Sequence, residues 1–275
     1  MMKKVWVVES IRYKKDGAEI TAVHKETKTE ETVFLPSEEF IRESLKEKES
    51  LNEDRWGKLK SDAAYFGAYR ECLRKLTLKD RTEKEITEIL YGQKGLNAEK
   101  RKEILDKLKK RNLVNDVEYA ENRIAELRMS LYGKNRIIRS LKEKGIEENL
   151  IWEKLESEDP NKEIERGREL AKKIESTLGS VPFREKKTRL KQKLMTRGYD
   201  PQDCDTILSS ITLLKDPAKE GSLLKKAAES AYRRYSGKKK GRELQSAVIR
   251  SLLGKGFGYE DIMTVIETME EQDES

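Results

Sequence analysis

The chain has 275 residues, of which 35% are hydrophobic and 40% are charged, against roughly 45–50% and about 25% in average globular proteins. This composition excludes a single thick core and favours thin layers of helices that each bury one apolar stripe. The formal net charge of +7 suggests a nucleic-acid or acidic-protein partner without distinguishing them. Residues 1–9 lack the features of a signal peptide, and no apolar run approaches the roughly 20 residues that span a bilayer. We therefore expect a cytoplasmic protein.

Short β-branched runs distinguish the first 35 residues from the rest. Three runs have the composition of strands: Val5–Val8, Ala18–Val23 and Thr32–Leu35. Lys15–Gly17 is a turn signal between the first two, so the sequence predicts a small β-hairpin or a three-stranded sheet. Pro36-Ser37 is expected to end the strands and to cap a helix from about Glu38. Residues 46–60 fit either a loop or an extended helix.

From about Ser61 onward the sequence predicts helices, and one feature of them repeats. Four times, a basic residue, a glycine and a bulky apolar residue follow a helical pattern: Lys94-Gly95-Leu96, Lys144-Gly145-Ile146, Arg197-Gly198-Tyr199 and Lys255-Gly256-Phe257. Glycine supplies the left-handed conformation after a helix, and the apolar side chain packs back on the last turn. The basic residue is favoured by the dipole at the helix C-terminus.

The helical patterns around these glycines have a common order. Each glycine separates a second helix from a short third helix, and a longer first helix precedes both. A period of about 50 residues indicates units stacked in a line. The sequence thus predicts a mainly α protein: an elongated tandem array of three-helix, helix-turn-helix-like repeats with a small β-rich N-terminal segment. The expected domains are residues 1–60, 61–112, 113–158, 159–214 and 215–275. The alternative is one irregular bundle whose glycine caps are similar by coincidence.

A more specific pattern covers residues 68–156. It consists of Ala68–Leu73, Arg81–Ile86, Leu113–Ala120, Gly133, Ile137, Leu141 and Lys144-Gly145-Ile146. This segment resembles the RecX regulators of RecA, in which a helix is followed by an Arg-Ser/Thr-x-x-Glu-Leu element. Leu113–Ala120 resembles the Leu-(Ile/Leu)-(Asn/Asp)-Asp-x-x-(Phe/Tyr)-Ala junction of that family, which is the most specific piece.

The resemblance is uneven along the chain. Thr82 stands where the family more often has serine, and Ile86 where it more often has leucine; neither change alters the physical role. Residues 157–270 match more loosely, as third and fourth repeats do in long members. Residues 1–60 match only in having a small β-rich start.

The resemblance to RecX implies a function without catalysis. It implies a negative modulator of the RecA recombinase that binds along the groove of the RecA–single-stranded DNA filament and limits filament extension, ATPase activity and strand exchange. It also implies weak binding of single- or double-stranded DNA without sequence preference, and a place in DNA recombination, DNA repair and the SOS response. No cofactor, metal or membrane partner is expected, and the chain is expected to act as a monomer.

The distribution of basic residues favours a binding surface independently of the resemblance. Residues 134–144, 184–197 and 225–241 have local charges of +4, +6 and +6, and each stretch lies in or just before the second helix of its unit. Such runs are often only solvated faces, but recurrence at one position in three units favours function. The candidate residues for binding RecA or DNA are Lys134, Arg136, Arg139, Lys186, Lys187, Arg189, Lys191, Lys193, Arg197, Arg233, Arg234, Lys238, Lys239, Lys240 and Arg242.

Four of the candidate positions, Lys187, Arg189, Lys191 and Lys193, are expected to be exposed. Replacing Lys187, Arg189, Lys191 and Lys193 with Ala or Glu is therefore expected to weaken binding without unfolding the unit.

The third helices have the opposite charge. Residues 147–159 hold six acids and one lysine, and residues 260–275 hold seven acids and no base. A helix-turn-helix protein that reads sequence presents basic or amide side chains from the helix after the turn, so sequence-specific recognition is disfavoured. Two modes of binding remain possible: phosphate contact by the second helices, or contact with an acidic protein surface.

The acidic residues 270–274 fit either a DNA-mimicking tail or a frayed terminus. Tyr232 and Tyr235 could stack on bases, but their helical spacing favours a core position.

The residue inventory argues against an enzyme. His24 is the only histidine, and Cys72 and Cys204 are the only cysteines, so neither a Cys–His pair nor a His/Cys metal cluster is expected. No G-x-x-x-x-G-K-[ST] or G-x-G-x-x-G motif occurs. The alternative function is a general, sequence-nonspecific nucleic-acid-binding helical adaptor, which would bind DNA tightly and be indifferent to RecA.

Overall fold

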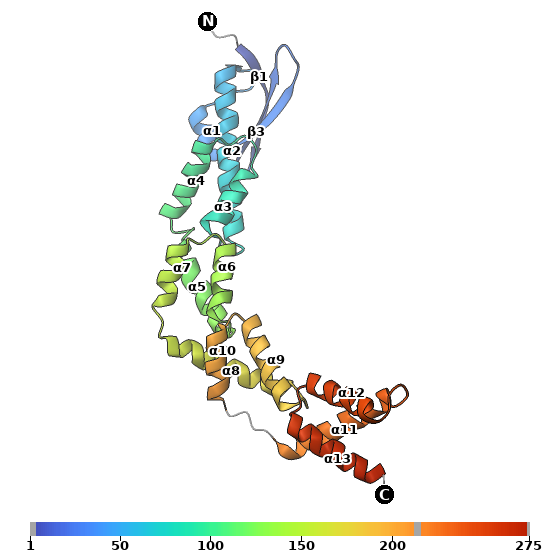
Figure 1. Ribbon diagram of the computed structural model, residues 1–275. Coiled ribbons are helices and arrows are strands. Elements are labelled where there is room, and N and C mark those ends of the chain that lie inside the picture. Colours follow the sequence, from blue (N-terminus) through green and yellow to red (C-terminus); the bar gives the residue numbers. More distant parts are fainter. Residues whose placement is uncertain (1–3, 212–215, 274–275) are drawn as a thin grey trace. The chain divides into compact units, whose positions relative to one another are not determined.

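The computed structural model describes residues 4–211 and 216–273 (Figure 1). The chain divides into two compact units, Met1–Glu121 with Lys142–Leu150, and Asn122–Leu141 with Ile151–Ser275. Over the described residues it is mainly helical, with one small N-terminal sheet. Within that part of the chain, every helix is too short or too polar to cross a membrane.

The N-terminal sheet is antiparallel and has four strands rather than two or three. These are β1 (Lys4–Lys14), β2 (Gly17–His24), β3 (Glu30–Pro36) and β4 (Ser50–Asn52), in the order β3-β2-β1-β4. The three expected runs all lie in strands. The three-residue strand β4 was not expected, because its single buried leucine gives no periodic signal.

Two buried tryptophans fix this sheet to the helix that follows it. The indole of Trp6 donates to Glu53 and that of Trp56 to Glu31, both at 2.7 Å. Their rings lie 5.4 Å apart in the core of the sheet. The polar edge of each indole is thus satisfied while its apolar body is buried.

The segment between the strands and the first long helix corrects two expectations. Helix α1 (Ser37–Glu43) starts as expected, but Pro36 occupies the cap position and makes no side-chain capping bond, so the expected cap is wrong. Residues 46–60 are neither a loop nor one helix. They contain β4 and the start of α2 (Glu53–Leu76), where Asn52 accepts the backbone N–H of Arg55. The helical part therefore begins before Ser61.

After α2 begins, the helices follow in four groups of three, as the glycine spacing predicted. The first group is α2, α3 (Glu83–Tyr91) and α4 (Ala98–Lys110), and the second is α5 (Asp116–Met129), α6 (Lys134–Glu143) and α7 (Glu148–Glu156). The third is α8 (Pro160–Thr177), α9 (Phe183–Thr196) and α10 (Pro201–Ser210), and the last is α11 (Pro217–Tyr235), α12 (Gly241–Gly254) and α13 (Tyr259–Asp273). The side chains of the acidic residues 270–274 lie outside the described residues.

Buried residues form several small cores rather than one thick core, as expected from the low apolar content. In the third group Leu190, Leu194, Tyr199 and Ile207 are buried together. In the last group Leu224, Val248, Leu252, Phe257 and Ile262 form a comparable cluster. Tyr232 and Tyr235 pack partly buried against that cluster, which favours the core interpretation of these two tyrosines.

The repeated glycines have the predicted left-handed backbone. Their φ angles are 80° at Gly95, 79° at Gly145, 96° at Gly198 and 90° at Gly256. The apolar residue after each glycine is buried. The first group differs in one respect: α3 ends at Tyr91, and its cap is Gly92 in the right-handed conformation. Gly95 therefore turns the chain within the connection rather than at the helix end.

Candidate functional site

The glycine turn of one group packs on the start of the second helix of the preceding group. Within the first unit, this junction joins the start of α3 to the turn between α6 and α7. Thr82 donates its hydroxyl to the backbone oxygen of Lys144 at 2.8 Å, and the Lys144 ammonium lies 2.8 Å from Glu85. A Cβ on Gly145 would lie 2.3 Å from the side chain of Lys84. The close approach explains why glycine is needed here.

The second unit contains the same junction between α6 and the turn that follows α9. The backbone N–H groups of Gly133 and Asn135 donate to the backbone oxygens of Arg197 and Gly198, both at 3.0 Å. A Cβ on Gly133 would lie 2.6 Å from the backbone of Gly198, and one on Gly198 would lie 2.5 Å from the nitrogen of Arg136. Two glycines thus permit direct contact between the two backbones.

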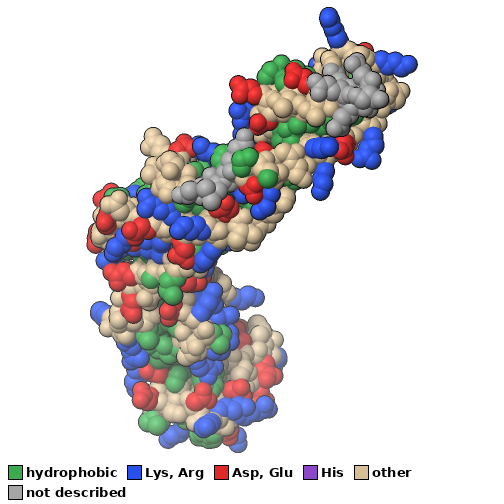
Figure 2. All heavy atoms as spheres, turned by 90° about the horizontal axis from the view of Figure 1, so that it is seen from below, with side chains coloured by type: hydrophobic (Ala, Val, Ile, Leu, Met, Phe, Trp, Pro, Cys, Tyr) green, Lys and Arg blue, Asp and Glu red, His purple; other side chains and the backbone are tan. Residues whose placement is uncertain are grey.

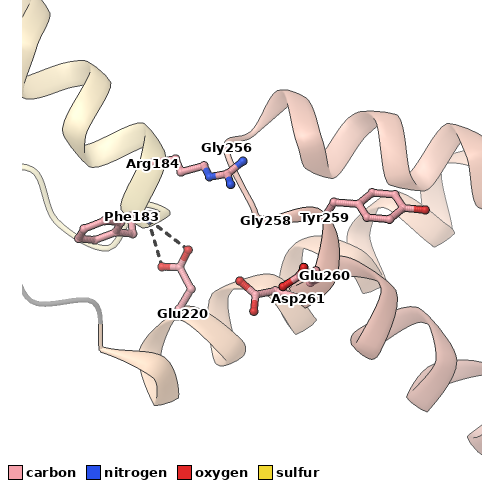
Figure 3. A pocket seen from close by; sticks show the side chains of 8 residues that line it. All are labelled: Phe183, Arg184, Glu220, Gly256, Gly258, Tyr259, Glu260 and Asp261. Atoms are coloured by element: carbon pink, nitrogen blue, oxygen red, sulfur yellow. Dashed lines mark hydrogen bonds between the residues drawn. The ribbon is translucent and has the colours of Figure 1, made fainter.

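The third junction joins the start of α9 to the turn between α12 and α13. A Cβ on Gly256 would lie 3.1 Å from the nitrogen of Glu185. A cavity of 410 Å³ lies beside this contact and is lined mainly by polar groups, including Arg184, Glu260 and Asp261. Figure 3 shows Tyr259 of the lining extending away from Glu220.

A carboxylate from the next group's first helix completes each junction. It accepts the backbone N–H of the first residue in the second helix: Glu83 donates to Asp116 (2.9 Å), Lys134 to Glu163 (2.7 Å), and Phe183 to Glu220 (3.1 Å; Figure 3). A carboxylate at a helix start satisfies an unpaired donor and interacts favourably with the helix dipole. The second helices are thereby held at one end. Their apolar side chains, such as Leu190 and Leu194 of α9, are buried, and the side chains on the opposite face are exposed to solvent.

These three acids were missed in the sequence, although they leave a signal. Asp116, Glu163 and Glu220 each lie in the first turn of a first helix. Their spacing of 47 and 57 residues nearly follows the 53 and 58 residues between the last three repeated glycines. Burial raises the pKa of Asp116 and of Glu163 above their ordinary values, because desolvation disfavours the charged carboxylate.

Replacing Glu163 should separate its hydrogen bond from its charge. A folded-state pKa that is raised means that the carboxyl contributes less stability as the pH rises through that pKa. Glu163→Gln retains an acceptor for Lys134 and should change the free energy of unfolding by less than about 0.5 kcal/mol, whereas Glu163→Ala leaves that donor unpaired and should lower it by about 1–2 kcal/mol. Urea unfolding at neutral pH measures both, and equal losses would contradict the capping role.

The candidate residues on α6 lie at the surface. Arg136 and Arg139 are exposed, and neither has an ion-pair partner among the described residues. Lys134 is half-buried, with its ammonium 4.8 Å from the centre of the Trp152 ring. Arg197 from the α9–α10 turn lies over Tyr132 at 4.8 Å. The junction therefore brings Lys134, Arg136 and Arg197 to one region of the second unit.

The candidate residues on α9 differ in how much of their charge is free. Arg189 pairs with Glu185 at 2.7 Å, Lys191 with Asp205 at 2.6 Å, and Lys186 with Glu175 at 3.6 Å. Lys187 and Lys193 are exposed and have no such partner in the described part of the chain. Surface ion pairs contribute little stability, but they reduce the charge presented to a partner. Lys187 and Lys193 are therefore the strongest candidates on this helix.

In the last group the candidate residues lie mainly outside the second helix. Arg233 and Arg234 end α11, Lys238–Lys240 form the turn, and only Arg242 lies in α12. The turn is at the opposite end of α12 from the Gly256 junction. A helix of 14 residues separates them by about 20 Å. These residues thus form a cluster apart from those on α6 and α9. Figure 2 shows basic and acidic side chains interleaved over the displayed face.

Helix α4 departs from the acidic pattern of the other third helices. It carries six bases and three acids. The basic character of this third helix was not predicted from the sequence. Several of these bases brace aromatic rings of their own group: Lys107 lies 4.6 Å from the Tyr69 ring and Arg101 4.6 Å from the Tyr91 ring. Lys107 and Arg101 thus stabilise the packing of the first group through cation–π contacts.

The remaining reactive side chains do not form a catalytic arrangement in the described residues. Cys72 and Cys204 are buried, and burial raises the pKa of each thiol to about 11, so both are protonated at neutral pH. His24 accepts the backbone N–H of Thr27 and packs against Trp6. Within the described ranges, no three His, Cys, Asp or Glu side chains are close enough together to hold a metal ion.

Comparison with known proteins gives concordant results over most of the chain. Residues 115–155 match the family model of the second three-helix domain of RecX, and residues 220–266 match that of the third. The regulatory protein RecX of Lactococcus lactis subsp. lactis is 28% identical over 240 residues, which cover 86% of this chain and 89% of that protein. The regulatory protein RecX of Streptococcus agalactiae serotype Ia is 27% identical, with 86% and 91% covered.

The chain belongs to the RecX family. The solved structure of RecX from Lactobacillus salivarius is 28% identical, with a TM-score of 0.50 over 55% of this chain and 98% of that chain. Another structure titled as regulatory protein RecX shares the fold, with a TM-score of 0.55 and 23% identity over 75% of this chain and 100% of that chain. The RecX third-domain model matches the fourth helical group here, so α8–α10 lie between the two matched segments.

Proposed function

We propose that this RecX family member restrains the RecA recombinase. It binds along the groove of the RecA–single-stranded DNA filament and limits filament extension, ATP hydrolysis and strand exchange. The proposal is supported by membership of a family of regulatory proteins named RecX. It is supported equally by the exposed cations of α6 and α9 that lack an ion-pair partner among the described residues. Such cations suit a partner that presents acidic side chains or phosphate groups.

The geometry of the junctions explains how such a surface stays available. The start of each of these helices is occupied by a carboxylate and a glycine turn. Arg139, Lys187 and Lys193 project beyond those contacts and are exposed. A partner can therefore engage them without disturbing the joints between the groups.

The direct test is ATP hydrolysis by RecA on single-stranded DNA. The chain is added at a ratio well below one copy per RecA protomer, and hydrolysis is followed over time. Suppression of hydrolysis is the expected result. An unchanged rate at every ratio would contradict the proposal, and tight DNA binding together with that result would favour a general nucleic-acid adaptor instead.

Removing Lys187 and Lys193 from α9 should weaken the restraint. For Lys187→Ala with Lys193→Ala, about tenfold more protein should be needed for half-maximal suppression, because two charge contacts are lost. Lys102→Ala with Lys110→Ala is the matched control, since both lysines are exposed on α4 and lie outside the proposed surface. Equal behaviour of the two double variants would exclude α9 from the interface.

A further inference from the structure

The densest positive charge in the chain lies at the corner between α11 and α12. Residues 233–242 contain six cations and no acid, and we call this group the cationic corner. It consists of Arg233, Arg234, Lys238, Lys239, Lys240 and Arg242. All are exposed except Lys239, which is half-buried. Figure 2 shows Lys and Arg side chains standing out from the outer end of this last helical group.

Little of this charge is neutralised by the chain itself. Lys239 pairs with Glu243 at 2.7 Å. The Arg233 guanidinium donates to a backbone oxygen, that of Glu229, at 3.4 Å, and Arg234 lies 5.5 Å from the ring of Tyr235. Neither contact brings a negative charge. The described residues provide no carboxylate partner for Lys238, Lys240 or Arg242. On α9, by contrast, Lys186, Arg189 and Lys191 all have one.

The backbone at the corner adds to this preference for anions. Lys240 precedes α12 and makes no side-chain capping bond. The first N–H of α3, α6 and α9 donates to a carboxylate from the next group. Among the described residues, the first N–H of α12, that of Gly241, has no corresponding acceptor. The acid in the first turn of α12 is Glu243, which pairs with Lys239. The first N–H at the positive end of this helix thus lies at the cationic corner without a carboxylate acceptor among the described residues.

We propose that the cationic corner binds the phosphate backbone of nucleic acid. The inference deepens the proposed function, on which it rests, by assigning the contact with DNA to the last helical group. Several cations on one turn without an intervening acid suit a polyanion with closely spaced charges. Tyr232 and Tyr235 are partly buried against the core of the group, so the contact is made to phosphates rather than by stacking on bases. Binding is therefore indifferent to sequence.

The test is the salt dependence of DNA binding by the full chain in the absence of RecA. A fluorescein-labelled oligothymidylate is titrated, and anisotropy gives the affinity at several salt concentrations. The corner variant combines three changes: Lys238→Ala, Lys240→Ala and Arg242→Ala. Loss of three phosphate contacts should reduce the slope of log affinity against log salt by about 2.

A matched control removes the same charge elsewhere. Lys102, Lys110 and Lys172 are exposed lysines of α4 and α8, and their replacement by Ala should leave the slope near that of the unchanged chain. Equal slopes for the corner variant and the unchanged chain would overturn the inference. So would normal DNA binding by a corner variant that no longer acts on RecA, because the corner would then contact protein.

A second measurement does not depend on the folding of any variant. Lysines of the unchanged chain are acetylated with and without the oligothymidylate, and the modified positions are identified by mass spectrometry. Protection of Lys238 and Lys240 by DNA supports the inference, and unchanged modification of both overturns it. The proposed function has a separate readout, RecA ATP hydrolysis, so the failure of either can be recognised. A duplex of the same length distinguishes single- from double-stranded phosphate.

Discussion

Gly198→Ala is expected to lower the free energy of unfolding by about 3 kcal/mol, because two costs combine. The first is a left-handed conformation for a residue with a Cβ, at roughly 1–2 kcal/mol, and the second is overpacking, at about 1–3 kcal/mol. The φ angle of Gly198 is 96°, and the new Cβ would lie 2.5 Å from the backbone nitrogen of Arg136. Because that neighbour is backbone, it cannot move aside as a flexible side chain can. Urea unfolding measures the loss.

Gly179→Ala separates the two costs. Gly179 also has a positive φ of 62°, but a Cβ there would meet nothing within 4 Å. The expected loss is therefore the conformational cost alone, about 1 kcal/mol. Equal losses for the two variants would show that the close approach between α6 and the α9–α10 turn contributes nothing to stability.

Glu158→Ala should have an effect of similar size for an electrostatic reason. Arg166 donates two hydrogen bonds to the Glu158 carboxylate, at 2.8 and 2.7 Å, and Arg128 lies 2.8 Å away. All three side chains are mostly buried. Removing the acid leaves two guanidinium groups without this counter-charge, which should cost about 2–3 kcal/mol. Glu169→Ala is the control, because its pair with Lys173 is exposed and should contribute less than about 0.5 kcal/mol.

The same network gives a pH dependence of known sign. Burial alone would raise the pKa of Glu158, but the hydrogen bonds and charges of Arg166 and Arg128 hold it below its ordinary value. A carboxyl with a lowered pKa in the folded state contributes stability above its ordinary pKa and loses it as the pH falls through the folded value. The difference in stability between the unchanged chain and Glu158→Ala should therefore shrink on acidification. A constant difference from neutral to strongly acidic pH would argue against an ionised Glu158.

Much of the helical architecture was predictable because it depends on local signals. Three such signals can be recognised within a few residues of sequence. They are a glycine suited to the left-handed conformation, the apolar residue after it, and a proline or capping residue before a helix. These signals predicted the groups of three helices. They failed where structure depends on distant pairing, as in β4, which exists because Leu51 pairs with Trp6 of β1.

The candidate site was less accessible to sequence reasoning. Counting charges identified α9 but could not show that Arg189 and Lys191 are paired, whereas Lys187 and Lys193 have no ion-pair partner within the described ranges. It also predicted that the cations of the last group lie in or just before the second helix, and the structure places Arg242 in α12 and the others at the end of α11 and in the turn before α12. Which cation is paired depends on the acids that the fold brings close, and the sequence does not reveal those neighbours.

The junctions suggest why the repeated glycines and first-turn acids occur together. A glycine allows the turn to approach a neighbouring helix start, and the acid from the same group supplies the carboxylate for that start. Both features attach one group to the preceding one. Neither occupies the outward-facing cations, so the joints and the proposed binding surface can be altered separately by substitution.

The proposed restraint of RecA filaments by the exposed cations of this chain can be observed while filaments grow. Fluorescently labelled RecA is assembled on a tethered single strand, and filament length is recorded before and after the chain is added. Growth should halt or reverse at ratios far below one chain per RecA protomer, and the Lys187→Ala, Lys193→Ala variant should need more protein. Filaments that lengthen at the same rate to the same final length, even with the chain in excess, would contradict the account.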